Sequence, residues 1–96
     1  MLIRVRLFAH LRDLAGKREI ELDMGNEERT ILDLVQLLSS RFGEDFKNAL
    51  LDPKTGKVRR YIKIMVKGKD LDLLNGLKTV IKDGDIVQLF PPIGGG

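Results

Sequence analysis

The chain has 96 residues, of which 43% are hydrophobic, and it carries 17 Lys and Arg against 14 Asp and Glu. This length and apolar content suit one small domain, and the absence of cysteine excludes disulfides, thiolate metal sites and a cysteine nucleophile. No apolar run approaches the roughly 20 residues of a membrane-spanning helix, and the first residues do not follow the signal-peptide pattern. We therefore expect a soluble, cytoplasmic protein with no membrane segment.

The first half of the chain predicts two strands and two helices. Residues 2–8 alternate between apolar and polar side chains, as in a strand with one buried face, and a short helical stretch follows over 9–16. Residues 18–24 alternate again, and the link between the two strands is too short for a parallel crossover, which favours an antiparallel hairpin. Residues 31–42 carry the apolar stripe of a core-facing helix. Thr30 with Asp33 is the capping box expected at the start of this helix, and Gly43 is the residue expected just after its end.

The second half predicts a short helix over 44–51, a turn near 52–56 and a strand over 61–66. Residues 67–68 form the next expected turn, and 70–77 have no clear assignment. Two apolar runs, 79–81 and 86–90, flank Lys82-Asp83-Gly84-Asp85, and an Asp-Gly pair in that position indicates a hairpin. The last strand is expected to end at Phe90, because Pro91 and Pro92 cannot donate to a ladder.

This order of elements predicts an α+β fold of the β-grasp (ubiquitin-like) kind. The first and last strands would be parallel neighbours in a mixed four- to five-stranded sheet packed on one main helix. Residues 1–90 would form the single domain. Residues 91–96 would form an extended tail.

The sequence shows no self-sufficient active site. It has no Gly-rich phosphate loop, no dinucleotide-binding motif and no His/Cys/Asp cluster at metal-ligand spacing. His10 is the single histidine and is expected to be structural or exposed, while Asp83 and Asp85 suit the turn between them. We therefore expect no bound metal or cofactor.

Basic residues concentrate between Lys54 and Lys69, with Tyr61 among them, and the net charge is +3. Such a segment raises the hypothesis of a nucleic-acid surface through Lys57, Arg59, Arg60 and Lys63. Charges on a half-buried strand more often form its solvated face, so nucleic acid is not the expected partner.

The end of the sequence, FPPIGGG, combines two stiff residues with three flexible ones. Pro91 and Pro92 would hold the base of a tail extended, and glycine lacks the Cβ that would obstruct a narrow channel. A terminal carboxylate on Gly96 could therefore be delivered into the active site of another enzyme and activated there as a mixed anhydride. The alternative is a frayed terminus without function.

Three segments make the chain resemble the small, MoaD-like subunit of molybdopterin synthase, within the ubiquitin-like and ThiS-like sulfur-carrier superfamily. They are VRLFAHLRDLAG at 5–16, TILDLVQLLSSRF at 30–42 and IKDGDIVQLFPPIGGG at 81–96. The chain departs from the family pattern at Gly94, where a small non-glycine residue is more usual, and at Lys67, where Asn is frequent. It is also longer at 52–60.

The resemblance implies a sulfur-donating subunit that is not an enzyme on its own. An activating enzyme related to ubiquitin-activating enzymes would use MgATP to adenylate the Gly96 carboxylate, and a sulfur donor would convert it to a thiocarboxylate. The tail would then enter a large MoaE-like subunit, where sulfur passes to cyclic pyranopterin monophosphate to build the dithiolene of the molybdenum or tungsten cofactor. By family position, the partner-facing residues would be Phe8, Arg12 and Phe90, and the tail entering the partner would be Pro91, Pro92, Ile93, Gly94 and Gly95.

Three alternatives stay open at this point. A ThiS-like carrier would load sulfur in the same way but serve thiazole synthesis or tRNA thiolation. An archaeal-type ubiquitin-like modifier would pass its acyl end to lysines of other proteins. A module that only binds other proteins would have the same fold with an inert tail.

Overall fold

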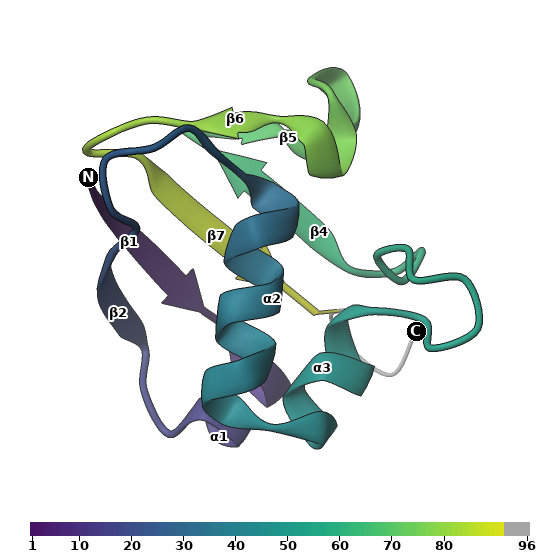
Figure 1. The fold of residues 1–96 in the computed structure, drawn as a ribbon. Helices are drawn as coiled ribbons and strands as arrows, with labels where there is room; N and C mark the ends of the chain where they lie inside the picture. The colour runs from purple at the N-terminus through teal and green to yellow at the C-terminus, as the bar shows by residue number, and fades with distance from the viewer. Residues whose placement is uncertain (92–96) are drawn as a thin grey trace.

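The computed structural model describes residues 1–91 and has an α+β architecture in which helices cover one face of a mixed sheet (Figure 1). The elements in chain order are β1 (Leu2–Leu7), α1 (Ala9–Ala15), β2 (Glu19–Asp23), β3 (Arg29–Thr30), α2 (Ile31–Phe42), α3 (Glu44–Leu50), β4 (Lys63–Val66), β5 (Lys69–Asp70), the 3₁₀ helices η1 (Leu71–Leu73) and η2 (Gly76–Lys78), β6 (Val80–Ile81) and β7 (Ile86–Phe90).

The sheet has the strand order β2-β1-β7-β4-β5. The first and last strands, β1 and β7, are parallel neighbours at its centre, while β1 with β2 and β7 with β4 are antiparallel. The predicted β-grasp arrangement is therefore confirmed, with five strands in the main sheet. A parallel pair needs a long crossover, and the whole middle of the chain, including α2, supplies it.

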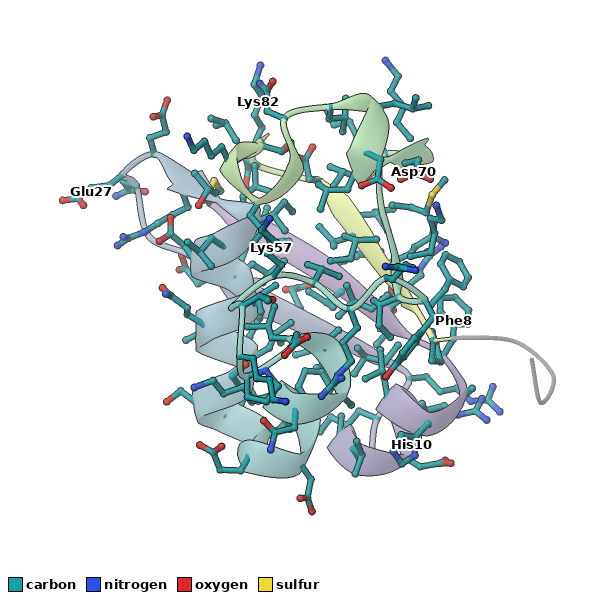
Figure 2. The ribbon with its side chains drawn as sticks, turned by 90° about the vertical axis from the view of Figure 1, so that its right-hand side faces the viewer. Phe8, His10, Glu27, Lys57, Asp70 and Lys82 are labelled. Atoms are coloured by element: carbon teal, nitrogen blue, oxygen red, sulfur yellow. The ribbon has the colours of Figure 1, made fainter. Side chains whose placement is uncertain are left out.

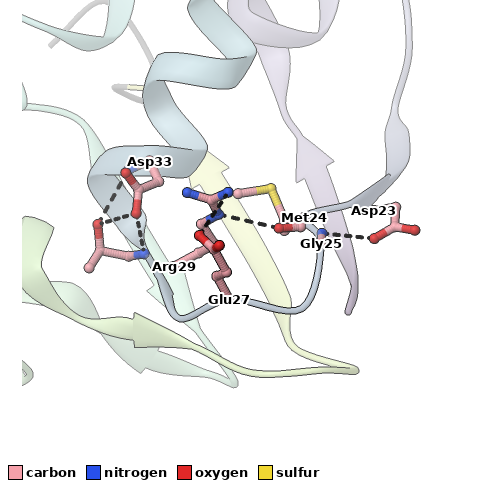
Figure 3. Close-up of polar contacts among 7 residues, drawn as sticks. Asp23, Met24, Gly25, Glu27, Arg29 and Asp33 are labelled. Carbon is pink, nitrogen blue, oxygen red and sulfur yellow. Dashed lines mark hydrogen bonds and ion pairs between the residues drawn. The ribbon is translucent and has the colours of Figure 1, made fainter.

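Helix α2 packs against the sheet through its predicted apolar stripe. Ile31, Leu34, Val35 and Leu38 are buried, and Ile3, Val5, Val87 and Leu89 meet them from β1 and β7. The predicted capping box is present at the first turn (Figure 3): the Asp33 backbone N–H donates to Thr30 Oγ1, and the Thr30 backbone N–H donates to Asp33 Oδ2 at 2.8 Å. Because this second bond favours the ionised carboxylate, it lowers the pKa of Asp33.

The predicted hairpin between residues 79–81 and 86–90 is wrong. The turn itself forms, with the Asp85 backbone N–H donating to the Lys82 carbonyl, but the strands on either side of it do not pair. Both edges of β7 are already occupied by β1 and β4, so no free edge remains for β6. Instead β6 pairs with β3 in a separate two-stranded sheet just before α2.

The strand β3 was not predicted, and the other predicted elements differ from the expectation only at their ends. The first strand stops at Leu7, and β4 begins at Lys63 instead of Tyr61, because the Ile62 backbone N–H closes a turn onto the Arg59 carbonyl. The unassigned segment 70–77 forms the end of β5 and most of two 3₁₀ helices. No helix among residues 1–91 is long and apolar enough to cross a membrane.

Candidate functional site

The candidate site lies where β7 ends and the chain leaves the sheet. Because β1 and β7 run in parallel with Leu7 opposite Leu89, Phe8 and Phe90 follow at the same edge of the sheet. Their rings stack with centroids 4.4 Å apart and planes 12° from parallel, and both side chains stay half-buried (Figure 2 labels Phe8 beside the end of β7). Two half-exposed stacked rings form a compact apolar surface of the kind that binds another protein.

The backbone after β1 places Phe8 on this surface. Phe8 is extended, with φ −125° and ψ 149°, and is the residue immediately before α1. Ala9 then has φ 50°, in the left-handed region that a non-glycine residue rarely adopts. This sharp change of direction leaves Phe8 beside Phe90, while Leu11, one helical turn later, is fully buried in the core.

Arg12, the third predicted contact residue, lies on α1, the helix that begins directly after Phe8. Its side chain is half-buried and has no ion pair or side-chain hydrogen bond within residues 1–91. It lines a shallow depression with Gly16, Lys17 and Arg18. The structure therefore joins Phe8 to Phe90 directly, while Arg12 contributes a free positive charge on the adjoining helix.

Pro91 is buried, although the sequence predicted that it belongs to an extended tail outside the domain. It lies at one side of an apolar cleft of about 460 Å³ between α1, α3 and the segment before β4. Leu11 and Ile62 are buried in the cleft, while His10 and Tyr61 are exposed at it. Pro92, Ile93, Gly94, Gly95 and Gly96 lie outside the described residues, so their predicted roles stay predictions.

Comparison with known proteins gives this arrangement a family. The ThiS family model matches residues 5–96, which include the second half of β1, all of α2 and β7, and the glycine end. The chain belongs to the ThiS family. The members of this family are small, ubiquitin-like sulfur carriers.

Two relatives are similar to this chain over the full length of both proteins. A small archaeal modifier protein 3 of Haloferax volcanii is 27% identical over 96 residues, and a candidate sulfur carrier protein of Archaeoglobus fulgidus is 32% identical over 96 residues.

Two solved structures confirm the fold. The small archaeal modifier protein 1 of Methanosarcina acetivorans has a TM-score of 0.79 at 30% identity, covering 99% of this chain and 96% of that one. A protein of Pyrococcus furiosus, named as a candidate molybdopterin converting factor subunit 1, has a TM-score of 0.74 at 27% identity, covering 97% and 99%.

The basic segment before and within β4 is partly engaged inside this ThiS-family domain. Arg59 Nε donates to the Asn48 carbonyl, and Lys63 Nζ donates to Asp70 Oδ2. The bond between the last two raises the pKa of Lys63 and lowers that of Asp70. Two of the four proposed nucleic-acid contacts therefore already have partners in the chain, which favours the solvated-face interpretation.

Sequence reasoning missed the cleft. Two residues that line the cleft had been noted for other reasons: Tyr61 as part of a basic segment and Ala49 as part of a short helix. These residues are separated from Pro91 by 30 and 42 positions, from the difference between their numbers. The one available signal was Tyr61 itself, an aromatic residue among charges, which is unusual for a solvated segment.

Proposed function

We propose that this chain carries sulfur as a thiocarboxylate on Gly96 and donates it during synthesis of the molybdenum or tungsten cofactor. The observation that carries the proposal is the family match over residues 5–96, which includes the glycine end together with the strand that leads to it. The similar structure from Pyrococcus furiosus is itself named as a candidate molybdopterin converting factor subunit 1, and this name favours a cofactor precursor as the sulfur acceptor.

Loading would take two steps, both performed by other proteins. An activating enzyme brings MgATP, and a Gly96 carboxylate oxygen attacks the α-phosphorus, which releases pyrophosphate and leaves an acyl adenylate. A hydrosulfide-equivalent donor then attacks the acyl carbon, so that a C–S bond forms and AMP leaves. The chain contributes the carboxylate and a run of glycines that leaves the reacting carbonyl unobstructed.

Delivery would depend on the surface around the end of β7. We assign Phe8 and Phe90 as the apolar contact with a large, MoaE-like synthase subunit, with Arg12 as a charged contact beside them. Pro91, Pro92, Ile93, Gly94 and Gly95 would pass through the mouth of the partner's active site. β7, paired on both sides, fixes the point from which this tail departs.

A second candidate function is supported by the modifier proteins among the relatives. The Haloferax volcanii relative and the Methanosarcina acetivorans structure are both named small archaeal modifier proteins. In that function, a lysine amine of a target protein would attack the activated Gly96 carbonyl and form an isopeptide bond. The same activation step serves both functions, and only the acceptor differs.

The test is the intact mass of the full-length chain before and after incubation with MgATP, the cognate activating enzyme and a sulfur donor. A gain equal to the replacement of one oxygen by sulfur, followed by its loss when the large synthase subunit and cyclic pyranopterin monophosphate are added, is the expected result. Conjugates to lysines of other proteins without a stable thiocarboxylate would support the modifier. No change in mass under any condition would refute both.

A further inference from the structure

A second depression, of about 430 Å³, lies between the segment before β4 and the 3₁₀ helices η1 and η2, and we call it the η pocket. Its interior is apolar and its rim is charged. The apolar lining residues are Val58, Ile62, Ile64, Leu71 and Leu77, and the charged ones are Lys57, Asp70, Asp72 and Lys78 (Figure 2 labels Lys57 and Asp70). Among the described residues, neither ring of the Phe8–Phe90 stack lines this pocket, and Pro91 does not line it either.

Leu73 lies beside the η pocket, between two residues of η1 and its end that border it in sequence. With 82% of its surface exposed, it is the most exposed large hydrophobic side chain among residues 1–91. Three residues complete one turn of a 3₁₀ helix, so Leu73, two positions after the buried Leu71, points in a different direction. An exposed leucine next to an apolar pocket forms a larger apolar surface than either alone, which is typical of a protein-binding site.

The backbone holds Leu73 in this exposed position. Asp70 Oδ1 accepts the Asp72 N–H at 2.9 Å at the start of η1, and the Leu74 N–H donates to the Leu71 carbonyl at 3.0 Å at its end. Asp70 is also bound to β4 through an ion pair. A partner therefore meets a leucine whose backbone is already ordered, which lowers the entropy cost of association.

Three charged side chains at the rim are available to a partner. Lys57, Asp72 and Lys78 form no ion pair and no side-chain hydrogen bond with any residue in the described part of the chain. One surface therefore carries an apolar projection, an apolar pocket and charges of both signs. Two copies related by a two-fold axis can place each projection in the other copy's pocket and each Asp72 opposite the other copy's lysines.

This self-complementarity selects the occupant. We propose that a second copy of this chain occupies the η pocket in an isologous dimer, with Leu73 of each copy inserted over the buried Ile64 and Leu71 of the other. Asp72 of each copy would face Lys57 and Lys78 of the other. The dimer requires no chemistry at Gly96, so it goes beyond the proposed function and does not depend on it.

Sedimentation velocity of the full-length chain, between about 10 µM and 1 mM, measures the association. The patch is small, so we expect a weak dimer with a Kd on the order of 0.1 mM. The average mass should rise with concentration from 10.8 kDa toward twice that value.

Leu73→Ala should lower the association constant at least about tenfold, because the dimer loses a buried leucine side chain from each copy. Leu37→Ala is the matched control, since Leu37 is an exposed leucine on α2 that does not line the η pocket. It should leave association unchanged. Denaturant midpoints of all variants are measured in parallel, so that a folding defect is not mistaken for lost association.

Exchanging the charges tests the two-fold arrangement itself. Asp72→Lys brings like charges together in the dimer, and so does the double variant Lys57→Asp with Lys78→Asp. Each should lower the association constant at least about tenfold when studied alone. In an equimolar mixture of the two, both halves of a mixed dimer bring opposite charges together, so association should return to within about threefold of the unchanged chain.

Four results would overturn the proposal. The unchanged chain could stay monomeric up to about 1 mM, a concentration at which the expected dimer is mostly formed. Leu73→Ala could associate as well as the unchanged chain, which would place the contact elsewhere. The mixture of charge variants could fail to recover. Finally, Leu73→Ala could weaken binding to the synthase while the unchanged chain stays monomeric, and the η pocket would then belong to that partner.

Discussion

The two ends of β7 are built from different chemistry. Before the strand, carboxylates bind the backbone: Asp83 Oδ1 accepts the Leu2 N–H at 2.7 Å, and Asp85 Oδ2 accepts the Lys82 N–H at 2.8 Å. After the strand, the stacked rings of Phe8 and Phe90 stay half-exposed. Polar groups satisfied inside the domain stabilise it, whereas exposed apolar groups are available to a partner. The start of β7 therefore contributes to stability, and the end of β7 is the part to which the proposed function assigns binding.

Asp85 shows this difference most clearly because it is a buried carboxylate, with 2% of its surface exposed. One oxygen accepts the Lys82 N–H, and the other, Oδ1, lies 3.1 Å from Lys67 Nζ. That second contact lacks hydrogen-bond geometry, so we treat it as an ion pair. Lys67 is largely exposed, and water weakens the pair compared with a fully buried one.

Asp85→Ala is expected to have the largest effect on stability. It removes a hydrogen bond from a buried carboxylate and leaves the Lys82 N–H without that acceptor, at a cost of about 2 to 3 kcal/mol in the free energy of unfolding. Urea unfolding of the full-length chain measures it. The matched control is Asp83→Ala, whose carboxylate is exposed and whose loss should cost about 1 kcal/mol. Equal losses in the two variants would show that burial at this turn is unimportant.

Phe90→Ala tests the other end of β7. Removing a half-buried stacked ring should cost about 1 to 2 kcal/mol of stability, because the stack and part of the buried apolar area are lost. Affinity for the large synthase subunit should fall at least about thirtyfold, as for a central interface residue. Titration calorimetry with the full-length chain measures the affinity.

Ile86→Ala is the control for Phe90→Ala, since Ile86 lies on the same strand, at the same side-chain parity and half-buried, but at the opposite end. It should lower stability by a similar amount without weakening synthase binding. If both variants bound the synthase equally well, the end of β7 would have no special role in delivery.

Acid should weaken the domain through Asp33, whose helix α2 begins directly after β3, the strand that pairs with β6 (Figure 1). The hydrogen bond from the Thr30 N–H lowers the pKa of Asp33 below its ordinary value of 3.8 in the folded chain. The folded state therefore gains stability above pH 3.8 and loses it as the pH falls through the lower, folded pKa.

We accordingly expect Asp33→Ala to be less stable than the unchanged chain at neutral pH, with a difference that shrinks as the pH falls below 3.8. Unfolding curves collected across the acid range measure this difference. If the difference in the free energy of unfolding stayed constant down to strongly acidic pH, the capping bond would not depend on the ionised carboxylate.

The sequence predicted the elements whose causes are local. The stripe of α2 and its cap at Thr30 depend on residues at most eleven positions apart, and both are confirmed. The pairing of β6 could not be read in this way. The Asp-Gly turn signal was correct, but whether its flanking strands pair depends on which strands occupy the edges of β7, and one of them, β1, is about 80 residues away along the chain.

The candidate site also contains some features that the sequence predicted and others that depend on contacts between distant segments. Phe8 and Phe90 were assigned by resemblance to the family, and the parallel pairing of β1 with β7 brings them into contact. The cleft at Pro91 is lined by four segments that meet only in the folded chain, so neither periodicity nor a motif could indicate it. The positive φ of Ala9 was equally hidden, since nothing in the residue type predicts it.

Replacing Ala9 by glycine has the smallest expected effect on stability, and it compares the two ends of β7 most directly. A left-handed conformation costs a non-glycine residue about 1 to 2 kcal/mol, and glycine loses about 0.5 to 1 kcal/mol through its extra freedom in the unfolded chain. Ala9→Gly should therefore raise stability by about 0.5 kcal/mol, since the exposed Ala9 side chain loses little packing. If the strained backbone holds Phe8 against Phe90, the same variant should bind the synthase severalfold more weakly despite its greater stability.

Lys67, at φ 53°, is the strained non-glycine residue at the opposite end, and Lys67→Gly is the counterpart variant. It should also relieve strain, but it removes the ion pair with Asp85, so we expect a net change within about 0.5 kcal/mol and unchanged synthase binding. Weaker binding in both variants would indicate a general loosening of the sheet. Weaker binding in Ala9→Gly alone would show that strain beside the tail serves recognition, because only there does the backbone set the position of an exposed ring.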